Sequence, residues 1–160
     1  VVSLYQNNEL KIPPELKNLE SRLGNVDDDP ETLVEYFQAD KEAEGAFVCN
    51  DREKFSSIYE LEKRKQQREV PPSYLLHMRL TGKIDRDQLV MLGDKFFKLL
   101  SNQLRSGDVI CRWNSKHFII LMTDITKKEA IKVRKRLINS FMARCELPEE
   151  LIIENKGYDL

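Results

Sequence analysis

Residues 105–122 read Arg105-Ser-Gly-Asp108-Val-Ile-Cys-Arg112-Trp-Asn-Ser-Lys-His117-Phe-Ile-Ile-Leu-Met122, and this stretch decides the fold. It holds two apolar runs, 108–113 and 117–122, joined by the short polar connection Asn114-Ser115-Lys116. Two runs of strand length with so short a connection are typical of a β-hairpin. Gly107 precedes the first run and breaks the helical pattern before it. We therefore predict a hairpin over residues 108–122.

Helical and extended patterns alternate on both sides of this hairpin. Residues 74–80 form an apolar run of strand length, and 151–153 form a last short one. Three helices are predicted, over 51–68, 85–104 and 126–144, and each begins at a pair with capping-box spacing: Asn50 with Glu53, Asp85 with Gln88, and Thr126 with Glu129. The resulting order is helix, strand, helix, hairpin, helix, strand. It predicts an α+β sandwich, with helices packed on a mainly antiparallel sheet.

Residues 1–44 have a different pattern, and we expect them to form a helical connector or the end of a preceding helical domain. Leu16, Leu19 and Leu23 lie at helical spacing, and a second helix is predicted from Asp29 to about Asp40. The stretch 24–29 is the best linker candidate. Because the chain does not begin with Met, we expect a C-terminal piece of a longer polypeptide or a processed chain. The main domain is predicted over 45–160.

The composition is that of a water-soluble protein. The chain has 160 residues, of which 41% are hydrophobic and 33% charged, and a net charge of -1, so no global basic field indicates nucleic acid. No apolar run approaches the roughly 20 residues that span a bilayer, and no signal-peptide pattern opens the chain, so we expect a cytoplasmic protein. Cys49, Cys111 and Cys145 have no metal-ligand spacing and are predicted to be reduced thiols.

The hairpin stretch resembles the core of GGDEF (diguanylate cyclase) domains. The family pattern is Arg-x-x-Asp, three residues, Arg, an aromatic residue, then Gly-Gly-Asp/Glu-Glu-Phe and an apolar strand. Here it reads Arg105-Ser-Gly-Asp108, then Arg112-Trp113, then Asn114-Ser115-Lys116-His117-Phe118. The resemblance covers roughly residues 45–155 and implies the nucleotide-cyclase-like form of the predicted sandwich.

A narrower resemblance begins upstream. The stretch Phe47-Val-Cys-Asn50-Asp-Arg52-Glu-Lys-Phe55 looks like the family's entry into its first helix. Gly45-Ala-Phe-Val-Cys49, followed by Phe55-x-x-Ile58-Tyr59-x-Leu-Glu62, resembles the divergent GGDEF-like tail of regulators that carry a bacterial transcriptional activator domain. This implies a regulatory domain of a bacterial transcriptional signalling protein, with DNA contact only through domains outside this chain.

The departures from the family pattern concern the metal site. Family members hold two divalent cations with acidic residues on the first strand and in the hairpin. In this sequence Arg79 stands near the first-strand position, Asn114 and Ser115 replace the two glycines, and Lys116 and His117 replace the two acids. Because basic groups repel Mg²⁺, we expect a degenerate domain that is not an enzyme and holds no metal or cofactor.

One ligand-related pair is retained. Arg105 and Asp108 occupy the positions that in the family form an inhibitory site for cyclic di-GMP, and an Arg fork with a carboxylate suits a guanine edge or a phosphate. The alternative is structural, since Asp108 follows a helix end, where carboxylates often cap backbone groups. The leading hypothesis is a non-catalytic interaction domain. Its expected partners are other domains of the same regulator, another protein or a second copy; the alternative function is a cyclic di-GMP receptor.

Overall fold

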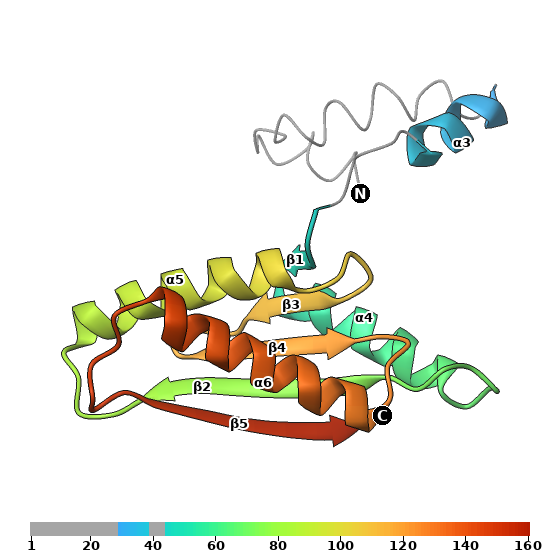
Figure 1. Cartoon of the computed structure of the whole chain (residues 1–160). Coiled ribbons are helices and arrows are strands. Elements are labelled where there is room, and N and C mark those ends of the chain that lie inside the picture. The colour runs from blue at the N-terminus through green and yellow to red at the C-terminus, as the bar shows by residue number, and fades with distance from the viewer. Residues whose placement is uncertain (1–28, 39–43) are drawn as a thin grey trace, which may run out of the picture. The chain divides into compact units, whose positions relative to one another are not determined.

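The computed structural model describes residues 29–38 and 44–160 (Figure 1). The chain divides into two compact units, residues 1–42 and 43–160. In the first unit, helix α3 (Pro30–Gln38) matches the helix predicted after Asp29, and the Asp29 carboxylate accepts hydrogen bonds from the Glu31 backbone and the Thr32 hydroxyl. The helix predicted around Leu16–Leu23 lies outside the described residues.

The second unit is built on a five-stranded sheet with the order β1-β3-β4-β2-β5. The strands are β1 (Phe47–Cys49), β2 (Tyr74–Thr81), β3 (Val109–Arg112), β4 (His117–Met122) and β5 (Ile152–Asp159). The β1–β3 pair is parallel and the other three pairs are antiparallel. The predicted hairpin is β3–β4, and the prediction of a mainly antiparallel α+β sandwich is confirmed.

Helices α5 (Arg86–Gln103) and α6 (Lys127–Arg144) cover one face of the sheet (Figure 1). Alternate residues of β2 point toward them, because successive strand side chains face opposite ways. Phe96 of α5 lies at the centre, with its ring centroid 5.2 Å from that of Phe118 and 4.5 Å from that of Phe141. All three rings are fully buried. This aromatic cluster holds both helices against β4.

Helix α4 (Arg52–Lys65) packs on the opposite face, over β1, β3 and β4 (Figure 1). Phe55 is buried there, in a second hydrophobic cluster with Cys49, Cys111 and Leu121. The buried Glu62 carboxylate, near the other end of α4, accepts a 2.7 Å hydrogen bond from the Ser73 hydroxyl. Because α4 covers only part of this face, the side chains on that side are half-buried along β2 and exposed along β5.

The helix starts confirm one predicted capping box and correct two. Thr126 and Glu129 form the reciprocal box at the start of α6. At α4 the cap is Asp51 rather than Asn50, and its carboxylate accepts from the backbones of Glu53 and Lys54. Asp85 precedes α5 but its side chain makes no capping bond. Spacing alone does not fix the φ and ψ angles that aim a side chain at the helix N-terminus.

Two strands differ from the sequence prediction. The prediction placed no strand at β1, which pairs in parallel with β3 although it is only three residues long. The last strand continues to Asp159, beyond the apolar run at 151–153. Its second half is polar and was not recognised, because an edge strand with one exposed face needs few apolar residues.

Candidate functional site

The hairpin turn is held by the Asn114 side chain. Its carbonyl oxygen accepts hydrogen bonds of 2.9 Å from the backbone N–H groups of both Lys116 and His117. The carbonyl oxygen of Ser115 accepts from the Arg112 guanidinium. Asn114, Ser115 and Lys116 are exposed, whereas Phe118 is buried in the core. An Asx-type turn therefore takes the place where the family pattern has two glycines.

The structure brings two histidines together on the sheet face left open by α4. His77 Nε2 lies 2.8 Å from His117 Nδ1, and the two half-buried rings stack with centroids 5.0 Å apart. One ring must donate and the other accept, so at least one is neutral. Burial lowers the pKa of His117, and the charges of His77, Arg79 and Lys116 add to this effect, while Glu154 opposes it.

Sequence reasoning did not find this histidine pair. His117 was singled out there as a residue that replaces an acid of the family pattern, and no contact between it and His77 was predicted. In the β2–β4 register Arg79 lies opposite His117 and His77 lies opposite Ile119, so the two histidines are diagonal neighbours. Diagonal cross-strand contacts depend on the register, which two separate apolar runs do not specify.

Basic groups surround the histidine pair. Arg79 reaches across to β5, where its Nε lies 2.8 Å from the Glu154 carboxylate and its Nη2 donates a second bond to it. Lys156 lies opposite His77 in the β2–β5 register. We call the surface formed by these groups the basic hairpin face: Arg79, Lys116, Lys156, His77 and His117, with Glu154 as its acidic member. The cations Arg79, Lys116 and Lys156 outnumber the carboxylate of Glu154, so the charge of this face favours an anionic ligand.

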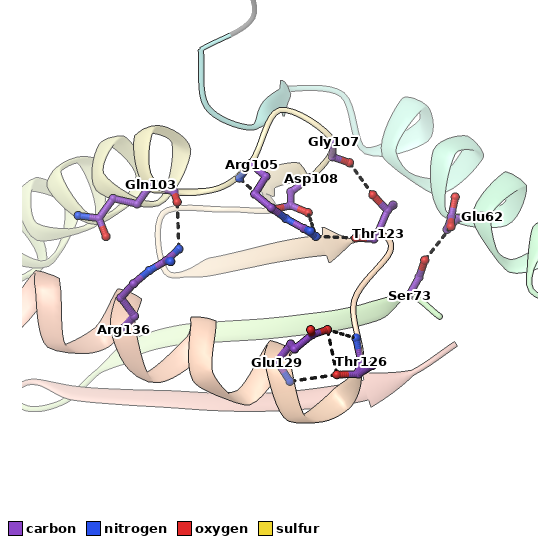
Figure 2. A network of polar contacts seen from close by, with 10 residues as sticks. All are labelled: Glu62, Ser73, Gln103, Arg105, Gly107, Asp108, Thr123, Thr126, Glu129 and Arg136. Atoms are coloured by element: carbon purple, nitrogen blue, oxygen red, sulfur yellow. Dashed lines mark hydrogen bonds and ion pairs between the residues drawn. The ribbon is translucent and has the colours of Figure 1, made fainter. Parts of the chain in front are cut away.

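Arg105 and Asp108 contact each other directly (Figure 2). The Asp108 carboxylate accepts a 3.0 Å bond from the Arg105 backbone N–H and a 3.1 Å bond from its guanidinium. The same guanidinium donates to the Thr123 carbonyl oxygen, which ties the α5–β3 loop to the end of β4. The Asp108 side chain is only 2% exposed and that of Arg105 is 52% exposed. Asp108 thus serves the local structure, while one edge of Arg105 stays open to solvent.

Arg112 of the hairpin is part of the family pattern, but its contacts were not predicted from the sequence. Arg112 forms an ion pair with Asp94 of α5, and its guanidinium lies 5.6 Å from the centroid of the Phe118 ring. A Cβ atom at the buried Gly93 would come within 2.7 Å of both Arg112 and the Ser115 carbonyl oxygen. Gly93 therefore permits the close approach of α5 to the hairpin, for which the only sequence signal is a glycine inside a helical pattern.

Metal-ligating side chains are scattered across the described parts of the chain. No three His, Cys, Asp or Glu side chains gather within residues 29–38 and 44–160 in a way that could hold a metal ion. None of the helices in these ranges is long and apolar enough to cross a membrane.

Comparison with known proteins identifies the family likeness of the hairpin region. The family model described as "Diguanylate cyclase, GGDEF domain" matches residues 91–151. One similar solved structure is a diguanylate cyclase protein from Thermotoga maritima, with a TM-score of 0.53 and 16% identity, covering 71% of this chain and 82% of that one. Another is the diguanylate cyclase SiaD from Pseudomonas aeruginosa in complex with its activator SiaC. It has a TM-score of 0.55 and 16% identity, covering 99% of this chain and 65% of that one. No curated protein matches significantly.

These matches correct one expectation. The basic residues at the signature hairpin led us to expect a chain that is not an enzyme. The matching family model and both solved structures are described as diguanylate cyclases, so the likeness is to a family of enzymes and that expectation is wrong. Substitutions at a few positions leave the likeness intact, because fold and motif spacing are set by many more residues.

Proposed function

We propose that this chain is a regulatory and interaction domain of the GGDEF type in a cytoplasmic bacterial signalling protein, and that it binds a guanine nucleotide through its phosphates. The observation that carries the proposal is the basic hairpin face. Lys116 and His117 stand at the signature turn, and Arg79, His77 and Lys156 flank them on the same side of the sheet. Arg79, Lys116 and Lys156 carry the positive charge of this surface, and such groups attract phosphates without needing a bridging metal ion.

The family match supplies the class of ligand. Diguanylate cyclases, by their name, handle guanine nucleotides, and residues 91–151 match their family model. The SiaD structure is a complex with an activator protein, which supports a protein-binding role for this chain. The stretch Gly45–Glu62 further supports a transcriptional regulator as the setting, with DNA contacted by other domains.

The test is isothermal titration of the chain with GTP, with and without Mg²⁺. We expect binding that weakens as salt is added and that persists without Mg²⁺, because exposed charges carry it. Lys116→Gln should raise the Kd about two- to fivefold, since an exposed charge pair contributes up to about 1 kcal/mol. Lys98→Gln, an exposed position on α5, is the matched control. No heat at millimolar GTP, or equal Kd values for the two variants, would overturn the proposal. Chromatography of the same samples tests whether the chain converts GTP, as the match to the diguanylate cyclase family model suggests.

A second candidate ligand is cyclic di-GMP at Arg105 and Asp108. The exposed half of Arg105 favours it, since this side chain lies beside a cavity lined in part by Gly107, Thr123 and Asp124. Both Asp108 oxygens already accept from Arg105, so the ligand would be held chiefly by the guanidinium. Titration with cyclic di-GMP tests this: Arg105→Ala should abolish binding while the chain stays folded by circular dichroism. Undiminished binding in that variant would exclude the site.

A further inference from the structure

Strand β5 is a long, open edge of the sheet. It runs over eight residues, Ile152–Asp159, and pairs with β2 on one side only. It stands at the end of the strand order, and no other strand within the described residues pairs with its outer side (Figure 1). Such an edge presents backbone N–H and C=O groups that a further strand can bind.

The sequence of β5 is complementary to itself when a second copy runs antiparallel with Asn155 opposite Asn155. In this register Glu154 lies opposite Lys156 of the other copy, and the symmetry repeats this pair on the other side of the centre. Directly opposite residues of antiparallel strands lie on the same face of a sheet, with Cβ atoms about 4.5–5.5 Å apart. Both charge pairs are therefore of opposite sign and close enough to attract.

The outer positions also match in this register. Ile152 lies opposite Tyr158 of the other copy, and these exposed side chains are accessible to 54% and 45%. Contact between an aromatic and a β-branched residue is among the favourable cross-strand pairs. On the other face Ile153 lies opposite Gly157, where the Tyr74 ring fills the space beside the glycine, so the two apolar groups would meet there. Shifting the register by two residues on one strand places Glu154 opposite itself or Lys156 opposite itself, so one pairing is selected.

We propose that β5 is a homodimerisation strand, through which two copies of this chain form a continuous antiparallel sheet across a two-fold axis at Asn155. Charged residues on an edge strand usually prevent such pairing. Here one acidic and one basic residue, placed symmetrically about Asn155, favour pairing with an identical strand. This adds a partner to the proposed regulatory role and does not rest on it, since no nucleotide takes part.

The test is sedimentation equilibrium of the whole chain across a concentration series. We expect a monomer–dimer equilibrium for the parent chain. Lys156→Glu should raise the dimer Kd at least about tenfold, because both attractive pairs become repulsive. The exchange of both charges, Glu154→Lys with Lys156→Glu, should restore dimerisation in part, because it restores opposite charges across the axis but removes the Arg79–Glu154 ion pair within each copy. Lys98→Glu makes the same charge change on α5 and should leave the Kd unchanged.

A covalent test checks the register. Asn155→Cys places two thiols directly opposite each other at the axis, within the range of Cα separations that a disulfide allows. Mild oxidation should give a cross-linked dimer, and the same treatment of Asn114→Cys should not. A chain that stays monomeric at all concentrations, or a dimer that is insensitive to Lys156→Glu and not restored by the exchange, would refute the proposal. Sedimentation and cross-linking are run without nucleotide, and the GTP test uses Lys116→Gln, so failure of the dimer and failure of GTP binding are distinguished.

Discussion

At the residue scale, Asp108 is the most deeply buried polar residue within the described part of the chain. The family likeness assigns it a ligand, whereas its contacts assign it to the α5–β3 loop, where it accepts from the backbone and side chain of Arg105. Only its spacing to Arg105 was visible in the sequence. Whether Asp108 binds a ligand or supports the loop depends on how deeply its carboxylate is buried. The packing of the α5–β3 loop sets that burial.

Replacing Asp108 should destabilise the fold. Asp108→Ala leaves the Arg105 N–H without its acceptor in a partly buried place, and we expect a loss of about 1–3 kcal/mol in the free energy of unfolding. Urea denaturation measures it. Arg105→Ala should cost less, because the guanidinium is half exposed and the backbone bond remains. A larger loss for the Arg105 variant would contradict this account of the pair.

The histidine pair predicts a pH dependence of stability. The pKa of His117 is lowered in the folded chain, so the unfolded chain binds the proton more strongly. The stability of the fold is therefore highest above the pKa of an unfolded histidine, about 6.5, and it falls as the pH drops below that pKa. Arg79 and Lys116 disfavour the charged ring, Glu154 favours it, and His77 is its hydrogen-bond partner.

Thermal melts between pH 7.5 and 5.5 check this expectation. The melting temperature of the parent chain should fall across that range, and the fall should be smaller in His117→Gln. Because the chain has only two histidines, His77→Gln is the matched second variant. Equal slopes in the parent and both variants would show that the pair does not control this pH dependence.

At the scale of elements, helix α6 has the complete capping box. The Thr126 hydroxyl accepts from the Glu129 backbone N–H, and the Glu129 carboxylate accepts from the Thr126 backbone N–H at 2.9 Å. The bond from the Thr126 backbone N–H, together with one that the Thr126 hydroxyl donates to the same carboxylate, lowers the pKa of the Glu129 carboxyl group. The contribution of these bonds to the stability of the fold is fully present above the ordinary pKa of a glutamate. It is lost as the pH falls through the lowered pKa of Glu129 in the folded chain.

Removing this cap should weaken the fold measurably. Thr126→Ala is expected to cost about 1 kcal/mol, because an N-terminal N–H of α6 loses its acceptor. Thr126→Ser keeps the hydroxyl and should cost much less. Chemical denaturation of the three proteins at neutral pH gives the comparison, and equal losses in the two variants would mean that the hydroxyl does not stabilise the helix.

At the scale of the whole molecule, Phe96 joins both helices of one face to the sheet. It contacts Phe118 of β4 and Phe141 of α6. Phe96→Ala should lower the free energy of unfolding by about 3–5 kcal/mol, as expected for truncation of a buried aromatic ring. The neighbouring Phe97 is only partly buried, so Phe97→Ala should cost clearly less in the same denaturation experiment. Similar losses would indicate that the cluster is not the centre of the core.

The sequence by itself determined the hairpin, the helix and strand order, the α+β class and the likeness to GGDEF domains. These follow from hydrophobic period, turn residues and motif spacing, which are local properties of the chain. It also placed Lys116 and His117 at the signature turn. The inference drawn from those residues, that the chain is not an enzyme, did not hold against the family match.

Only the tertiary structure decided which of these residues meet. Strand register placed His77 against His117 and Arg79 against Glu154, and helix packing set Arg112 beside Asp94. It also turned the polar residues 154–159 into the open edge of the sheet. The physical reason is that register and packing arise from contacts between segments distant in sequence, which no local pattern encodes.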